Sequence, residues 1–222
     1  MPFNDFNKGF DRMASKKPNV KKRNEEQYYE PIKGCLGLAM GHYLDPEKVL
    51  QDRLWEDMPK RIYLEIIGGK NLFSDNLKKT FDDDTLNIIK NEGIFPDLVG
   101  FVQKNSQSPK KIIIAEVKDE PIALKMVAKA KFYKEIFNAT FAFLVSTHGV
   151  SEERVRFLLK KPLIKEGVII AKFIPNPQYN LGHIEINARF KETVPDFLHF
   201  WLRPKETEPK SKPSFATRIF KH

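Results

Sequence analysis

The chain has 222 residues, 41% of them apolar, and a net charge of +9. This length and composition fit one globular domain with appended segments and exclude a wholly disordered chain. No apolar run reaches the ~18 residues of a transmembrane helix, and residues 1–10 contain no apolar signal core. The single cysteine, Cys35, excludes an intramolecular disulfide and a zinc site with two thiolates. We therefore expect a cytoplasmic protein without membrane contact.

The excess positive charge lies at the two ends. Residues 1–24 hold seven basic and two acidic side chains, and residues 203–222 hold six basic and two acidic ones. Basic ends around a neutral domain, 25–202, are typical of arms that contact a polyanion such as DNA; the alternative is that they only aid solubility. We therefore predict a basic N-terminal arm over 1–24 and a basic, proline-rich tail over 203–222, which is also a candidate docking segment for a protein partner. The nucleic-acid contacts expected in the first arm are Lys21, Lys22 and Arg23.

Apolar periodicity predicts the elements in chain order. A 3.6-residue pattern predicts a helix from Asn24 to about Met40, in which Pro31 marks either a later start or a bend. Runs of β-branched residues predict strands over 61–67, 94–102 and 111–118, and the three consecutive isoleucines of the last indicate burial on both faces. The later predictions are a helix over 121–137, a strand over 140–146, a helix over 151–160, strands over 167–173 and 183–189, and a short helix over 196–202.

This order predicts an α/β fold with a central mixed sheet flanked by helices. The strand–helix–strand alternation of the second half requires at least one parallel crossover. The region 70–93 is ambiguous, and its pattern favours only a short helix over Thr85–Asn91, which the acidic run before it would cap and Gly93 would end.

A carboxylate and an ammonium lie together at the end of the strongest predicted strand. Glu116 and Lys118 are two residues apart, so both project from one face while Val117 projects from the other. Buried charges are costly unless they are paired or bind a metal, and open α/β sheets bind ligands at the carboxyl ends of their strands. If strands 94–102 and 111–118 pair through the hairpin between them, Asp97 comes within range of the same cation. Such carboxylates suit Mg²⁺ or Mn²⁺.

Pro96-Asp97, an 18-residue spacer and Glu116-Val117-Lys118 resemble the PD-(D/E)xK signature of restriction-endonuclease-like phosphodiesterases. The predicted element order over about residues 25–146 also resembles the αβββαβ core of that superfamily. The resemblance implies that Asp97, Glu116 and the carbonyl of Val117 bind Mg²⁺ or Mn²⁺. It also implies that Lys118 assists the attacking water.

The same resemblance implies further site residues on two helices. Many members have an acidic residue on the first helix that faces the site, and Glu25 is the candidate here because it shares a helical stripe with Tyr29. Some members carry Gln and Tyr on the helix after the lysine strand, where this chain has Lys129 and Tyr133. Together with Lys125 these residues are candidate contacts to the scissile phosphate; the alternative is that the lysines lie on the solvent face of an amphipathic helix.

The sequence thus predicts a Mg²⁺- or Mn²⁺-dependent nuclease that hydrolyses phosphodiester bonds of DNA, or of RNA, by water attack. A homodimer is the assembly that the resemblance implies. The alternative is a catalytically inactive subunit of the same fold that binds nucleic acid or recruits other proteins. In that case Glu116 and Lys118 would form an ordinary ion pair at a strand end.

Overall fold

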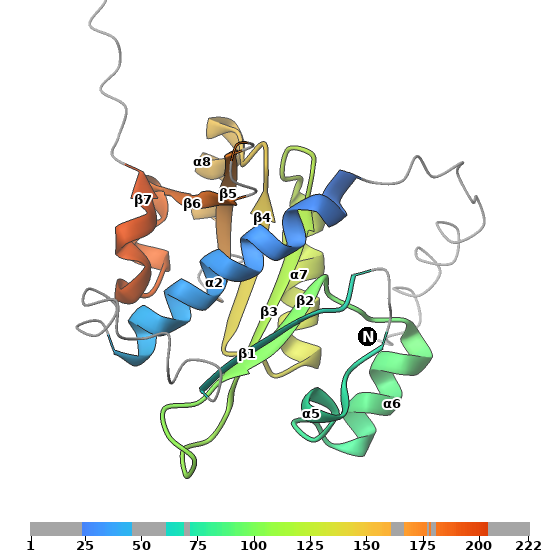
Figure 1. Ribbon diagram of the computed structural model, residues 1–222. Helices are drawn as coiled ribbons and strands as arrows, with labels where there is room; N and C mark the ends of the chain where they lie inside the picture. Colours follow the sequence, from blue (N-terminus) through green and yellow to red (C-terminus); the bar gives the residue numbers. More distant parts are fainter. Residues whose placement is uncertain are drawn as a thin grey trace, which may run out of the picture.

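The computed structural model describes residues 24–45, 61–68, 72–160, 167–176, 178 and 181–203. Their strands form a seven-stranded sheet in chain order, with helices on both faces (Figure 1). The predicted contacts Lys21, Lys22 and Arg23 and the tail after Arg203 lie outside the described residues. The strands are β1 (Ile62–Ile66), β2 (Leu98–Val102), β3 (Lys111–Lys118), β4 (Phe141–Ser146), β5 (Val168–Asn176), β6 (Leu181–Asn187) and β7 (Leu202–Arg203).

The sheet is mixed, as the sequence predicts. Strands β1, β2 and β3 pair antiparallel, whereas β3, β4 and β5 pair parallel. The crossover connection from β3 to β4 contains α7 (Leu124–Ile136), and the one from β4 to β5 contains α8 (Glu152–Lys160). Because parallel strands run in the same direction, the carboxyl ends of β3, β4 and β5 lie at one edge of the sheet. No helix among the described residues is long and apolar enough to cross a bilayer.

The first helix begins later than the periodicity predicts. Residues Asn24–Tyr28 form a 3₁₀ turn, η2, and the α-helix α2 spans Tyr29–Leu44. Pro31 is then the third residue of α2, where a backbone N–H has no intrahelical partner to lose. The apolar stripe of α2 is fully buried and packs mainly against β1 and β6, across one face of the sheet (Figure 1).

The second predicted strand is shorter than expected. Residues 94–97 precede β2 without joining it, since Pro96 has no N–H for the ladder. The ambiguous region forms α5 (Asp75–Lys78) and α6 (Asp83–Glu92). The predicted cap and stop of α6 are confirmed: Asp82 accepts a hydrogen bond from the backbone of Thr85, and Gly93 has a φ of 62°. Two 3₁₀ helices lie towards the end of the described chain. The first, η4 (Ala188–Thr193), is not predicted from the sequence, whereas η5 (Asp196–Trp201) occupies the position of the predicted short helix over 196–202.

The two faces of β3 belong to different apolar clusters. Ile113, Ala115 and Val117 pack with the stripe of α2, whereas Ile112 and Ile114 pack with Tyr133 and Phe137 around α7. This confirms the predicted burial of the strand on both faces. Side chains alternate along a strand, so Glu116 and Lys118 follow Ile112 and Ile114 on the face of α7.

Candidate active site

The antiparallel pairing of β2 and β3 brings the three predicted site residues Asp97, Glu116 and Lys118 together. Leu98 pairs with Ala115, which places Asp97 beside Glu116. Glu116 and Lys118 end β3 and are only 3% and 7% exposed. The predicted hairpin pairing is therefore confirmed, and three ionisable side chains meet at the carboxyl edge of the sheet.

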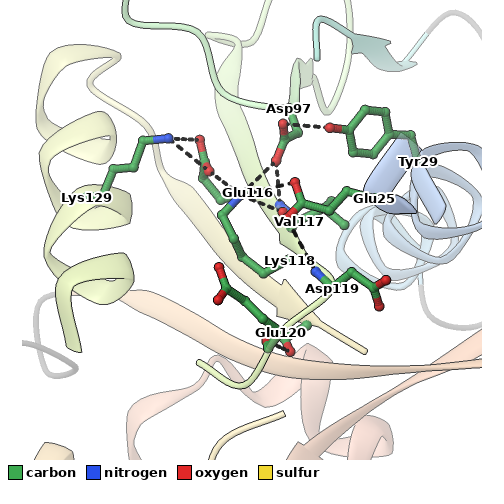
Figure 2. Close-up of polar contacts among 10 residues, drawn as sticks. Glu25, Tyr29, Asp97, Glu116, Val117, Lys118, Asp119, Glu120 and Lys129 are labelled. Carbon is green, nitrogen blue, oxygen red and sulfur yellow. Dashed lines mark hydrogen bonds and ion pairs between the residues drawn. The ribbon is translucent and has the colours of Figure 1, made fainter. Parts of the chain in front are cut away.

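The ammonium of Lys118 lies among oxygen atoms from four residues (Figure 2). Its Nζ is 3.1 Å from Oε2 of Glu116, 3.6 Å from Oδ2 of Asp97 and 3.7 Å from Oε2 of Glu25. It also donates a hydrogen bond of 2.6 Å to the carbonyl oxygen of Val117. All the oxygen-bearing groups that the resemblance implicates thus converge on one cationic atom.

Glu25 reaches this cluster from η2, not from the helical stripe on which it was predicted. Its side chain is buried, and Oε1 accepts a weak hydrogen bond, 3.5 Å long, from the backbone N–H of Asp119. The 3₁₀ turn contacts the end of β3. Glu25 therefore lies beside Lys118 at the end of β3, and its position depends on the turn before α2.

Asp97 is held by groups from three segments. Its Oδ1 accepts a 2.9 Å hydrogen bond from the Tyr29 hydroxyl, and its Oδ2 accepts a 2.7 Å bond from the backbone N–H of Val117. Its carbonyl oxygen accepts from the backbone N–H groups of Ile67 and Gly68. A Cβ atom at position 68 would lie 2.5 Å from the Tyr29 ring, so only glycine allows this approach. The carboxylate is fixed with Oδ2 directed towards Lys118.

Tyr29 is the site residue that the sequence analysis missed. Its apolar ring placed it on the buried stripe of α2, and it is indeed 7% exposed. The available clue in the sequence is the hydroxyl group of Tyr29, because a buried tyrosine hydroxyl needs a hydrogen-bond partner. Sequence alone gave no indication that this partner was Asp97.

The two lysines predicted on α7 differ in their contacts. Nζ of Lys129 is 3.2 Å from both carboxylate oxygens of Glu116 and 4.8 Å from the centroid of the Tyr133 ring. Lys125, one turn earlier, is exposed, and within the described part of the chain no ion pair or hydrogen bond joins it to the carboxylates. The solvent-face alternative therefore describes Lys125, whereas Lys129 belongs to the cluster.

Burial and charge act in opposite directions on these groups. Burial, followed by the charge of Asp97, raises the pKa of Glu116, although Lys118 and Lys129 partly offset this rise. Burial lowers the pKa of Lys118, but Glu116, Asp97 and Glu25 outweigh it, so this pKa is raised overall. Lys118 is therefore an ammonium at neutral pH. The pKa of the Tyr29 hydroxyl is raised by burial and by Asp97, so this group stays a donor.

The donor set has the chemistry of a magnesium or manganese site. Three carboxylates and one carbonyl are the hard oxygen ligands that these ions prefer. In the described segments, no three acidic, histidine or cysteine side chains already form a metal-binding group, and the Lys118 ammonium lies between the carboxylates instead. The residues fit a divalent cation provided that this ammonium moves aside.

No family model matches the chain, and the searches of curated proteins and of solved structures likewise find no match.

Proposed function

We propose that the protein is a Mg²⁺- or Mn²⁺-dependent nuclease of the PD-(D/E)xK type that hydrolyses phosphodiester bonds of DNA, with RNA as the second candidate substrate. The observation that carries the proposal is the convergence of Asp97, Glu116, Glu25 and the Val117 carbonyl within 3.7 Å of one cationic nitrogen. The order of α2, β1, β2, β3, α7 and β4 also supports it.

In this proposal the metal is held by Asp97, Glu116 and the carbonyl of Val117, with Glu25 beside them. A divalent cation bound there would stabilise negative charge on the phosphate and lower the pKa of a bound water. The Tyr29 hydroxyl and the Val117 N–H keep the Asp97 carboxylate in one orientation. Preorganised ligands of this kind need little rearrangement during the reaction.

Lys118 acts as a donor in this scheme. It is charged at neutral pH because three carboxylates surround it, so it orients the attacking water or a phosphate oxygen by donating hydrogen bonds. Lys129 neutralises part of the negative charge of Glu116 and lies on the same side of the site. Together the two lysines offset the repulsion between the carboxylates and a phosphodiester.

The test is a cleavage assay on a panel of single-stranded and duplex DNA and RNA with Mg²⁺ or Mn²⁺. We expect cleavage that EDTA abolishes and that is lost in Asp97→Asn and Lys118→Met. Asp84→Asn and Lys90→Met, which change exposed residues of α6, are the matched controls and should cleave normally.

Two results would contradict the proposal in different ways. Full activity in Asp97→Asn and Lys118→Met would show that the site is assigned wrongly. Binding of nucleic acid without cleavage by either metal would refute the enzyme and favour a catalytically inactive binding subunit.

A further inference from the structure

A polar cavity opens at the same edge of the sheet as the candidate active site. It has a volume of about 180 Å³ and lies between the loop after β4, the start of α8, and strands β5 to β7. We call it the side groove. Its polar lining residues are His148, Glu152, Lys172, Glu185, Asn187 and Arg203.

The strand register connects the side groove to the candidate site. Lys118 pairs with Ser146 on β4, and Ser146 pairs with Lys172 on β5. Neighbouring strands are about 4.8 Å apart, so the Lys172 backbone lies roughly 10 Å from that of Lys118. Paired residues project from the same face of a sheet. Lys118, Ser146 and Lys172 therefore form a row across β3, β4 and β5 on one face, with a lysine at each end.

Lys172 forms no ion pair among the described residues, although its cross-strand partner on β6 is Glu185. The residue is half-buried. Gly149, with a φ of 72°, lies against the side chain: a Cβ atom there would be 3.3 Å from Cβ and Cδ of Lys172. The lysine stem is thus packed along the wall of the groove, and no ion pair among the described residues occupies its ammonium.

The acidic residues of the groove, in contrast, have basic partners. Glu152 is 3.3 Å from Arg189, and Glu185 is 3.9 Å from Arg203. Three of these four side chains are about half exposed, so each pair adds little stability, but the pairs offset the negative charge of the two glutamates. Around the groove, Lys172, Arg189 and Arg203 stand against Glu152 and Glu185, so one positive charge is in excess, and Lys172 is the basic residue without an ion pair among the described residues.

A chain of hydrogen bonds joins the wall of the groove to the end of β3. Thr147 Oγ1 donates to Asp119 at 2.6 Å and lies 2.9 Å from Nδ1 of His148. A carboxylate only accepts, so the threonine proton goes to Asp119 and the proton on His148 Nδ1 goes to the threonine oxygen. The backbone N–H of Thr147 also donates to the carbonyl of Lys118. The loop that forms the groove is thus attached directly to the strand that carries the site.

We propose that the side groove binds a phosphate of the nucleic-acid strand a few nucleotides from the phosphate that is cut, with Lys172 as its positive contact. This inference rests on the proposed function. A single strand crossing from Lys118 to Lys172 follows the carboxyl edge of the sheet and meets one cation at each position. Such contacts release counterions and strengthen binding irrespective of base sequence.

The test measures the binding of labelled single-stranded and duplex oligonucleotides in EDTA, which prevents cleavage, over a series of salt concentrations. Lys172→Gln should weaken binding about fivefold at physiological salt and reduce the slope of log K against log salt by about 1, for every sequence tested. Lys172→Arg should restore both values. Lys90→Gln removes the same charge from α6 and should change neither, and thermal melting verifies that each variant is folded.

The outcomes separate this inference from the proposed function. If the wild-type protein cleaves but Lys172→Gln binds as well as Lys90→Gln, the groove is assigned wrongly and the nuclease stands. If Lys172→Gln shows the binding defect but no divalent metal supports cleavage, the groove stands and the nuclease is refuted. If Lys172→Gln loses binding of inorganic phosphate but not of oligonucleotides, the groove holds a free anion, and the strand assignment is overturned.

Discussion

Replacing Lys118 with methionine tests the geometry on which the candidate site depends. The change keeps most of the apolar stem but leaves the carboxylates of Glu25, Asp97 and Glu116 facing one another without the ammonium between them. These side chains are 8%, 14% and 3% exposed, so water screens them poorly. We expect a large loss of stability at neutral pH.

The magnitude follows from the distances. At 3.1 to 3.7 Å, each ion pair is worth about 5 kcal/mol with an effective dielectric constant near 20. Desolvation offsets several kcal/mol for each buried ion, and removal of one partner from a buried pair costs about 3–5 kcal/mol net. For a domain of this size, this corresponds to a decrease in Tm of about 6–20 °C.

The effect should depend on pH with a definite sign. The pKa of Lys118 is raised in the folded state, so its stabilising contribution is complete below the ordinary lysine pKa and is lost only as the pH rises through the raised value. At pH 7 the whole contribution is present. In Lys118→Met the penalty should shrink in acid, because protonation of the carboxylates removes their repulsion, beginning with Glu116, whose pKa is raised.

The assay is thermal melting at neutral and acidic pH, with and without Mn²⁺. A cation that binds only the folded protein stabilises it by about 2.7 kcal/mol at 100 times its Kd, and Mn²⁺ should rescue the variant more than the wild type. Lys90→Met, on the exposed face of α6, is the control. If Lys118→Met melts within about 2 °C of this control at pH 7, the carboxylates do not share the ammonium and the reasoning fails.

Three further substitutions test neighbouring features of the fold, each by urea unfolding. Tyr29→Phe removes a buried hydrogen bond to a carboxylate and should cost about 1.5–3 kcal/mol, whereas Tyr28→Phe should be nearly neutral; equal stability of the two would refute the role of the hydroxyl. Gly100→Ala would bring a Cβ atom against a backbone oxygen of β1 and should cost about 3 kcal/mol, while Gly34→Ala, with open space around it, should not destabilise; a stable Gly100→Ala would contradict the β1–β2 register. Lys129→Gln removes a half-exposed ion-pair partner of Glu116 and should cost less than about 1 kcal/mol of unfolding free energy. Because the pKa of Lys129 is raised in the folded protein, this cost should be constant from neutral pH up to about pH 10. A loss of stability as large as that of Lys118→Met would show that solvent does not screen the charge of Lys129.

Local sequence determined the strand that carries the chemistry. The isoleucines of β3 require a strand buried on both faces, and the period of two places Glu116 and Lys118 together and Val117 opposite. The short polar connection from β2 to β3 then brings Asp97 beside Glu116. These predictions succeeded because each depends on residues close in the chain, whose spacing alone sets the direction of their side chains.

Only the tertiary structure decided the remaining contacts. Glu25 reaches Lys118 because η2 lies across the end of β3, the Tyr29 hydroxyl meets Asp97 because Gly68 allows its ring to approach, and Lys172 continues the row because β5 pairs in register with β4. Each of these contacts joins elements that are distant in sequence. Periodicity shows which face of an element is buried, but packing determines the neighbour that this face meets.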